Sequence, residues 1–265
     1  MIRLDVLAAS FAGISREAAK NLITGGHVRV GGVTCTKAGA KFPGDAVLAV
    51  DLPGEMFVSR GGHKLQKALR VFDIKLDGKV CLDIGAATGG FTDCMLQNGA
   101  EHVVAIENGH GQLAEILQQD KRVTSLENTD IRNVRLDFAA DFAACDLSFI
   151  SVAKAAEPIA ALLNPDAQAV FLIKPQFETG PGHVNKQGVV KNPKAHIAAI
   201  SQTINSLIGC GFVICGLDFS PITGANGNIE YLTYAVKHSN AQHISPPFIS
   251  DNAINSIVKS AFSAL

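Results

Sequence analysis

The sequence has no apolar run long enough for a membrane-spanning helix, which takes about 20 consecutive apolar residues. Purely apolar stretches such as residues 169–173 are far shorter, and the N-terminus lacks the basic-then-apolar pattern of a secretory signal. The six cysteines form no CxxC pair, which argues against a disulfide framework or a zinc site. No His, Cys and carboxylate cluster has metal-ligand spacing either. We therefore expect a cytoplasmic protein with reduced thiols, no membrane contact and no metal.

The chain also has little net charge, with 23 Lys and Arg residues against 24 Asp and Glu. This balance argues against a nucleic-acid partner, because binding phosphates requires local positive charge. The charges are unevenly distributed, however: residues 1–79 hold 12 basic and seven acidic residues, whereas residues 80–265 hold 11 and 17. This asymmetry predicts that the first third of the chain docks on a polyanion. The length of 265 residues and the 47% hydrophobic content suit a small domain joined to a larger one.

Residues 1–58 have the pattern of a small α+β domain. Apolar spacing predicts a helix over 2–11, and Ser15 is placed to cap a second helix that ends at the Gly25-Gly26 pair. Alternating stretches predict short strands at 27–30, 33–36 and 46–50, with turns at 31–32 and 43–44. Arg16 and Lys20 share one helix face, which taken alone is typical of an ordinary solvated surface.

The order of short motifs in this segment is more specific. It contains Arg-Leu-Asp at 3–5, Ser-Arg-Glu-Ala at 15–18 and Ile-Thr-Gly-Gly-His-Val-Arg-Val-Gly-Gly at 23–32. This order resembles the small RNA-binding domain shared by a small-subunit ribosomal protein and bacterial pseudouridine synthases. In that family the helix with the Ser-Arg pair and the following hairpin face RNA. The residues that we predict to contact RNA are Arg3, Arg16, Lys20, Arg29 and, at the start of the next segment, Arg60.

From Ser59 onward, apolar strands alternate with amphipathic helices. Strands are predicted at about 79–84, 102–107, 122–126, 143–147, 168–174, 211–218 and 230–236, and helices near 90–99, 111–119, 151–163 and 193–208. This alternation predicts an α/β, doubly wound, mostly parallel seven-stranded sheet over 59–240, with helices on both faces. Residues 241–265 are expected to form a separate, partly helical tail.

Residues 80–91 read Val-Cys-Leu-Asp-Ile-Gly-Ala-Ala-Thr-Gly-Gly-Phe, a strand that enters a glycine-rich turn and then a helix. Gly85 and Gly89 leave room for a ligand near the backbone, although glycines at such turns also serve packing. Asp83 lies at the end of the strand, and Glu107 at the end of the next strand can accept ribose hydroxyls. A dinucleotide site would have Gly-x-Gly-x-x-Gly spacing, and its pyrophosphate would be repelled by Asp83. S-adenosylmethionine, which carries a sulfonium and an amino-acid end but no phosphate, fits this turn better.

The second segment resembles the methyltransferase domain of the TlyA family, sometimes labelled haemolysin, whose catalytic domain is similar to that of FtsJ ribose methyltransferases. The motifs are Ser-Arg-Gly-Gly-His-Lys-Leu at 59–65, Asp-Ile-Gly-Ala-Ala-Thr-Gly-Gly-Phe-Thr-Asp at 83–93, Gly-His-Gly-Gln-Leu at 109–113, Asp-Leu-Ser-Phe-Ile-Ser at 146–151, Lys-Pro-Gln-Phe-Glu at 174–178, Gly-Val-Val at 188–190 and Gly-Asn-Ile-Glu-Tyr at 227–231. Ala87 stands where serine is common, and Glu107 stands where aspartate is common.

This resemblance implies a catalytic set of Lys64, Asp146, Lys174 and Glu230 around the target hydroxyl. A ribose 2′-hydroxyl is a poor nucleophile, so Lys174 would act either as a neutral base or as an ammonium that stabilises the developing alkoxide. Asp146 and Glu230 would hold the lysines in place and balance their charge. The residues predicted to contact the cofactor are Asp83, Gly85, Ala86, Thr88, Gly89, Gly90, Glu107 and Asp130.

The sequence therefore predicts an S-adenosylmethionine-dependent ribose 2′-O-methyltransferase acting on ribosomal RNA, with cytidines of the small or large subunit as the targets that the resemblance implies. One alternative is a membrane-damaging haemolysin, as the family's older label proposes. Another is an NAD-linked oxidoreductase, for which the glycine spacing is wrong. The Gly- and Pro-rich stretch 178–190 is either a lid over the substrate or an ordinary surface loop.

Overall fold

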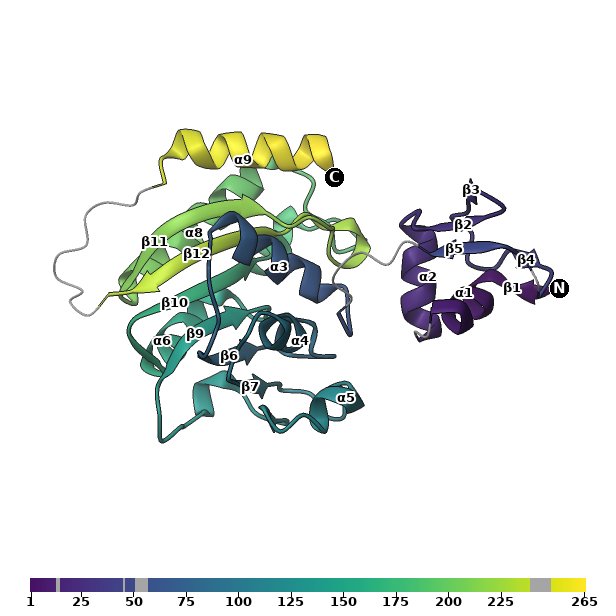
Figure 1. Cartoon of the computed structure of the whole chain (residues 1–265). Helices are drawn as coiled ribbons and strands as arrows, with labels where there is room; N and C mark the ends of the chain where they lie inside the picture. Colours follow the sequence, from purple (N-terminus) through teal and green to yellow (C-terminus); the bar gives the residue numbers. More distant parts are fainter. Residues whose placement is uncertain (13–14, 45, 51–56, 239–248) are drawn as a thin grey trace. The chain divides into compact units, whose positions relative to one another are not determined.

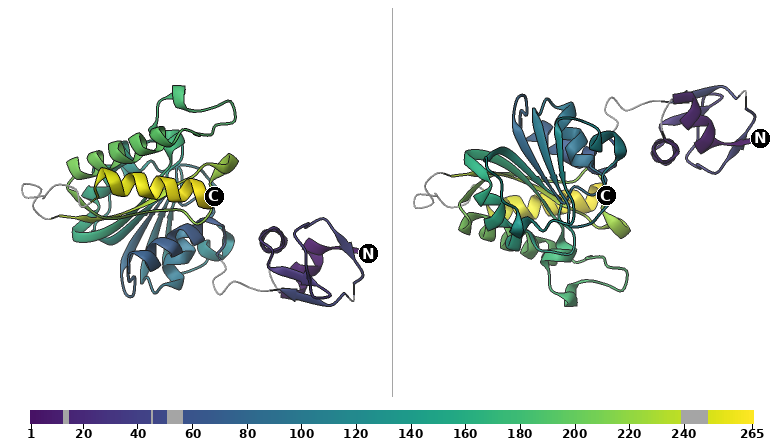
Figure 2. Two further views of the ribbon diagram at one scale, coloured as in Figure 1. Left: turned by 90° about the horizontal axis from the view of Figure 1, so that it is seen from above. Right: turned by 90° about the horizontal axis from the view of Figure 1, so that it is seen from below.

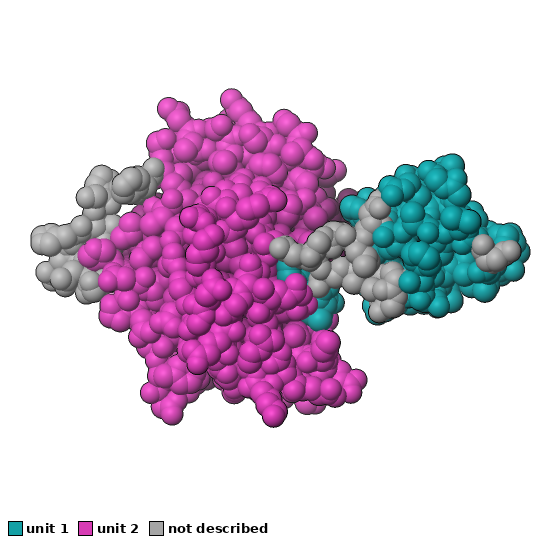
Figure 3. All heavy atoms as spheres, viewed as in Figure 1, with its two compact units in different colours: residues 1–59 teal, residues 60–265 magenta. Residues whose placement is uncertain are grey.

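The computed structural model describes residues 1–12, 15–44, 46–50, 57–238 and 249–265. Within these ranges the chain forms two compact units, residues 1–59 and residues 60–265 (Figure 3). Each unit has a hydrophobic core of its own.

The N-terminal unit combines two short helices with small antiparallel sheets. Its elements are β1 (Ile2–Arg3), α1 (Leu4–Ala12), α2 (Arg16–Thr24), β2 (Val28–Val30), β3 (Val33–Thr34), β4 (Lys41–Phe42) and β5 (Leu48–Val50). Strand β2 lies between β3 and β5, and β1 pairs with β4. The predicted cap of α2 is present, because the Ser15 hydroxyl accepts a hydrogen bond from the Ala18 N–H at 3.2 Å. The core consists of Leu4, Ala8, Ala19, Leu22, Ile23 and Val28.

The larger unit is built on a seven-stranded sheet (Figure 1). Its strands are β6 (Val80–Ile84), β7 (His102–Ile106), β8 (Val123–Leu126), β9 (Ala140–Cys145), β10 (Leu163–Ile173), β11 (Phe212–Phe219) and β12 (Tyr231–Lys237). They lie in the order β11-β12-β10-β9-β6-β7-β8, in which β12 runs antiparallel to the other six strands. The predicted mostly parallel seven-stranded sheet is confirmed. The strand order reverses between β6 and β9, where ligands bind at the carboxyl ends of such sheets.

Helices cover both faces of this sheet (Figure 2). They are α3 (Gly61–Val71), α4 (Gly90–Gln97), α5 (Glu115–Gln118), α6 (Val152–Ala161), α7 (Pro175–Glu178), α8 (Pro193–Gly209) and α9 (Asp251–Ala264). Helices α3 and α4 pack together on one face, and α6, α8 and α9 lie on the other. The C-terminal helix α9 packs on α8 and β11 within the larger unit. Residues 241–248 of the expected tail lie outside the described ranges.

The helix predicted over 2–11 begins only at Leu4. Ile2 and Arg3 instead form β1, because their backbone pairs with β4. A two-residue strand such as β4 has too little alternation to be predicted from sequence, so long-range pairing overrides the local helical pattern here.

The bounds of three elements in the larger unit also differ from the prediction. The helix predicted near 111–119 shortens to α5, since Gly111 has a φ of 65°, which is incompatible with an α-helix. Strand β9 starts and ends earlier than predicted, so that Asp146 follows it. Lys174 likewise follows β10. Both side chains therefore lie in the loops at the edge of the sheet.

Candidate active site

Three of the four predicted catalytic residues lie at one edge of the sheet. Asp146 directly follows β9, and Lys174 directly follows the parallel strand β10. Glu230 immediately precedes β12, whose antiparallel pairing with β10 brings its first residues to the same edge. Lys64 comes from the first turn of α3. The structure thus brings together four side chains that are distant in the sequence.

The four side chains form a continuous set of ion pairs with alternating charge. Lys64 Nζ lies 2.6 Å from Glu230 Oε2 and 3.8 Å from Asp146 Oδ2. Lys174 Nζ lies 2.6 Å from Asp146 Oδ1 and donates a hydrogen bond to Ser148 Oγ at 2.9 Å. Burial raises the pKa of Glu230, and the neighbouring Lys64 opposes this rise. The side chain of Asp146 is 19% exposed and those of both lysines and Glu230 no more than 10%, so the set opens to solvent mainly at Asp146.

Two glycines make room for the Glu230 carboxylate and for the backbone at Asp146. A Cβ atom at Gly224 would overlap the Glu230 carboxylate. At Gly85, which has a φ of 85°, a Cβ atom would come within 2.7 Å of the Asp146 backbone oxygen. The glycine-rich turn after β6 is therefore in direct contact with the loop that carries Asp146.

Asp83 is fully buried near the end of β6 and is only partly satisfied. Its Oδ2 atom accepts hydrogen bonds from the Thr92 N–H at 2.8 Å and the Thr92 hydroxyl at 2.6 Å. Its Oδ1 atom has no hydrogen-bond partner among the described residues. Burial raises the pKa of Asp83 to about 7. A buried oxygen without a donor is costly, so this turn fits a ligand that supplies a cationic donor.

The other predicted cofactor residues surround the same turn. Gly85, Ala86, Thr88, Gly89 and Gly90 run from the end of β6 into α4. Glu107 follows β7 and accepts hydrogen bonds from the Ala87 N–H at 2.9 Å and the Gly109 N–H at 2.7 Å. Asp130 stands apart from these contacts and pairs with Arg132, whose hydrogen bonds lower the pKa of Asp130 to about 2. Glu107 thus joins the turn to the next loop, whereas Asp130 faces an arginine.

Sequence reasoning missed Phe149, which lies three residues after Asp146. Its side chain is 91% exposed, and its φ of 66° is strained for a bulky residue. Its ring centroid lies 5.2 Å from that of Phe177, three residues after Lys174. The only sequence signal was its position inside the motif at 146–151, because neither exposure nor backbone strain is visible in residue types.

Glu178 was also missed, although it closes the motif at 174–178. Its Oε2 atom accepts a hydrogen bond from the Ser151 hydroxyl at 2.6 Å, and its Oε1 atom accepts one from the Val152 N–H at 2.9 Å. Burial raises the pKa of Glu178. This carboxylate therefore joins the segment that carries Lys174 to the segment that carries Asp146.

The stretch 178–190 contacts the loop that precedes Glu230. The Asn228 side chain donates to the Gly188 carbonyl at 2.9 Å and accepts from the Val190 N–H at 3.2 Å. Asn226 donates to the Gln187 carbonyl at 2.9 Å. Hydrogen bonds thus connect two motifs that are separated in the sequence, and the role of this stretch as a lid stays a prediction.

Four of the five residues predicted to contact RNA lie in the N-terminal unit. Arg3 and Arg16 both donate hydrogen bonds to Asp5. Lys20 is one turn beyond Arg16 on α2, and Arg29 lies in β2. The fifth residue, Arg60, is exposed and immediately precedes α3 in the larger unit.

Most of the basic excess of residues 1–79 lies outside the N-terminal unit. Residues 1–59 contain six basic and five acidic residues, whereas residues 60–79 contain six basic and two acidic. Most of the basic excess predicted for the RNA-docking domain therefore belongs to Arg60 and helix α3, because the loop after α3 holds two basic and two acidic residues. The charge count divided the chain after residue 79, whereas the units divide after residue 59.

The strand order, the glycine-rich turn and the carboxylate after β7 define the fold class of S-adenosylmethionine-dependent methyltransferases. A solved enzyme of that description from Mesorhizobium loti has this fold, with a TM-score of 0.50 at 18% identity over 66% of this chain and 99% of that chain. Residues 57–237 match the FtsJ-like methyltransferase family, and residues 2–48 match the S4 domain.

Relatives whose match extends over most of this chain narrow the family. The 16S/23S rRNA (cytidine-2′-O)-methyltransferase TlyA of Mycobacterium tuberculosis is 39% identical over 83% of this chain and 84% of its own length. Hemolysin A of Brachyspira hyodysenteriae is 40% identical over 84% of this chain and 94% of its own. A solved Streptococcus thermophilus protein with the hemolysin label is 37% identical, with a TM-score of 0.77 over 99% of this chain and 96% of that chain. The chain belongs to the TlyA family of FtsJ-like methyltransferases.

Proposed function

We propose that this protein transfers a methyl group from S-adenosylmethionine to the ribose 2′-hydroxyl of a cytidine in ribosomal RNA. The alternating ion pairs of Lys64, Glu230, Asp146 and Lys174 carry this proposal, because a ribose hydroxyl needs a positioned group that takes or stabilises its charge. The name of the Mycobacterium tuberculosis relative specifies the same reaction on 16S and 23S rRNA. Such a reaction needs access to ribosomal subunits, which are cytoplasmic.

The glycine-rich turn fits the proposed cofactor. Asp83 Oδ1 is a buried oxygen that lacks a donor, and the ammonium of the cofactor's amino-acid end would supply one. Glu107 follows the adjacent strand and would accept the ribose hydroxyls of the cofactor. When bound, S-adenosylmethionine supplies an electrophilic methyl group on a sulfonium.

Lys174 Nζ is the atom that we assign to the substrate hydroxyl. Asp146 and Ser148 hold it from two directions, at 2.6 and 2.9 Å. Lys64 is held by Glu230 and lies on the other oxygen of Asp146, so it fixes the carboxylate that orients Lys174. The proton of the hydroxyl would pass to Lys174 if it is a neutral amine. As an ammonium, it would instead stabilise the developing alkoxide.

Phe149 suits the recognition of a single unpaired base. RNA-binding proteins stack unpaired bases on aromatic side chains, and the exposed ring of Phe149, three residues after Asp146, could serve this purpose. The neighbouring Phe177 supports the ring from one side. The strained backbone at Phe149 is consistent with a functional role, since such strain concentrates at ligand sites.

Methyl transfer from tritiated S-adenosylmethionine to isolated ribosomal subunits tests the proposal. Label on a ribose 2′-oxygen is expected, and label on a base carbon or nitrogen would refute ribose chemistry. Lys174→Ala should abolish transfer while calorimetry still detects cofactor binding. Lys154→Ala, an exposed lysine on α6, is the matched control and should retain the full rate. An unimpaired Lys174→Ala enzyme would overturn the assigned site.

Lys174→Arg separates the two roles of the lysine. An arginine keeps the positive charge but cannot act as a base near neutral pH. Measurable transfer by this variant would therefore exclude the base role.

The alternative of membrane lysis is favoured only by the label that some relatives carry. No helix in the described part of the chain combines the length and apolar content of a membrane crossing. Lysis of erythrocytes by the purified protein alone would revive this alternative.

A further inference from the structure

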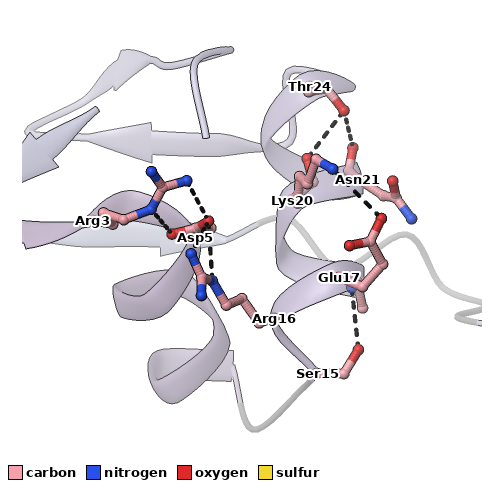
Figure 4. Close-up of polar contacts among 9 residues, drawn as sticks. Arg3, Asp5, Ser15, Arg16, Glu17, Lys20, Asn21 and Thr24 are labelled. Carbon is pink, nitrogen blue, oxygen red and sulfur yellow. Dashed lines mark hydrogen bonds and ion pairs between the residues drawn. The ribbon is translucent and has the colours of Figure 1, made fainter. Parts of the chain in front are cut away.

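A nearly buried carboxylate lies between two arginines in the N-terminal unit (Figure 4). Asp5 belongs to the first turn of α1, and its side chain is only 3% exposed. Arg3 donates from Nε to Oδ1 at 3.0 Å and from Nη2 to Oδ2 at 2.8 Å. Arg16, at the start of α2, donates from Nε and Nη2 to Oδ2, both at 3.1 Å. The hydrogen bonds from Arg3, aided by those from Arg16, lower the pKa of Asp5, which keeps it ionised at neutral pH.

This arrangement fixes two guanidinium groups side by side at the surface. Both touch the same carboxylate oxygen, yet the side chains of Arg3 and Arg16 remain 45% and 59% exposed. Asp5 engages Nε and Nη2 of each arginine, and in neither does it contact Nη1. Gly39 packs beside Arg3, where an added Cβ atom would lie 3.4 Å from Nη1. The two Nη1 groups that Asp5 does not engage thus belong to side chains whose orientation is already set.

We propose that Asp5 is a positioning residue for RNA binding, which holds Arg3 and Arg16 as a two-guanidinium clamp for backbone phosphates. This inference rests on the proposed function, because it takes ribosomal RNA as the ligand. Guanidinium groups bind phosphate oxygens through paired, directional N–H donors, so their orientation affects affinity. Without the carboxylate, the two like charges repel each other and lose their common anchor.

The small net charge of this unit strengthens the argument. Residues 1–59 contain only one more basic than acidic residue, so long-range attraction to RNA is weak. Affinity must then depend on how individual donors are oriented. Asp5→Asn therefore distinguishes two mechanisms by the sign of its effect. It removes a negative charge, which alone would tighten binding to a polyanion, but it also removes the shared anchor, which would weaken binding.

The test measures binding of the full-length protein to isolated ribosomal subunits over a range of salt concentrations. Asp5→Asn is expected to bind about tenfold more weakly, with a shallower dependence on salt because fewer phosphates are contacted. Glu17→Gln is the matched control, since it removes one acidic charge next to Lys20 on the exposed face of α2. It should bind as tightly as the wild type or more tightly.

Arg16→Lys tests the clamp independently, in case the Asp5 variant does not fold. It keeps the net charge and leaves the Arg3 bonds to Asp5 in place, so the unit should remain folded by circular dichroism. The clamp predicts weaker binding of Arg16→Lys, because lysine lacks the guanidinium fork. In an Arg3→Ala, Arg16→Ala background, Asp5→Asn should cause no further loss.

Equal or tighter binding by both Asp5→Asn and Arg16→Lys would overturn the clamp. If the wild type methylates the subunits in the same preparation, the proposed function survives that result. Absence of methyl transfer by the wild type would instead count against the proposed function itself.

Discussion

Replacing Asp83 with asparagine tests whether the ionised Asp83 carboxylate, buried at the glycine-rich turn, destabilises the folded protein. The asparagine side chain keeps an oxygen that can accept the two hydrogen bonds from Thr92, so the local packing is preserved. The substitution removes only the carboxylate whose Oδ1 atom lacks a donor. The consequence should be a change in how stability depends on pH.

The magnitude follows from the two pKa values of Asp83. In the unfolded chain an aspartate has a pKa near 3.9, whereas burial raises the pKa of Asp83 in the folded protein to about 7. Between these values the folded state holds a proton that the unfolded state has lost. The free energy of unfolding of the wild type therefore falls as pH rises, by about 1.4 kcal/mol per pH unit from this group. Over the whole interval the loss is about 4 kcal/mol, and it levels off above pH 7.

Asparagine does not titrate, so the variant should gain stability relative to the wild type as pH rises from 5 to 7. Urea unfolding of the cofactor-free protein, followed by far-ultraviolet circular dichroism, measures this difference. Alkylation of Cys81 and Cys145, both fully buried in the larger unit, assigns the transition to that unit. If the difference in stability between the two proteins stays constant with pH, the pKa of Asp83 is not raised in the folded protein.

Cofactor binding gives an independent readout of the same group. An ammonium ligand binds the ionised form of Asp83, so the affinity of the wild type for S-adenosylmethionine should rise about sevenfold between pH 6 and 7.2. This range stays below the pH at which an α-amino group loses its own proton. The Asp83→Asn protein should bind more weakly, and its affinity should not vary over this range.

Three further substitutions have defined outcomes. Phe149→Gly should raise the free energy of unfolding by about 1 kcal/mol, because glycine adopts a φ of 66° without strain. The same substitution should slow methyl transfer at least about tenfold, because the stacking ring is lost. A variant with the full rate of transfer would exclude the stacking role. Gly85→Ala should lower the free energy of unfolding, measured with urea, by about 2 kcal/mol or more, because the new Cβ atom meets the Asp146 backbone. It should also slow methyl transfer. Wild-type stability and rate would contradict this close approach. Ser15→Ala should destabilise the N-terminal unit by about 1 kcal/mol in thermal unfolding, whereas Ser10→Ala within α1 should have a smaller effect.

The architecture of the larger unit could be predicted because its strands are buried on both faces. Continuous apolar stretches such as residues 103–106 and 169–173 have no polar alternation, which is the pattern of a covered parallel sheet. Asp146 and Lys174 interrupt that pattern where strands end, which marked them as site residues. The residue types alone therefore predicted that Asp146 and Lys174 belong to one site, and the structure shows that the two side chains form an ion pair.

Features that depend on unusual backbone or on a neighbour's shape could not be predicted. Phe149 has the residue type of a core side chain, and only the folded chain shows that its ring faces solvent. The unpartnered oxygen of Asp83 depends on where Thr92 lies after α4 has packed against the sheet. The short strands β1 and β4 form through pairing of distant segments, which local patterns do not encode.

The bridge made by Glu178 has an evolutionary consequence. Because its carboxylate accepts hydrogen bonds from the Ser151 hydroxyl and the Val152 N–H, the segments 146–152 and 174–178 share one partly buried junction. A substitution on either side leaves a buried polar group without its partner. These segments should therefore change in concert as the family diverges. A recombinant that takes one segment from a distant homologue should be viable only when the other is inherited with it.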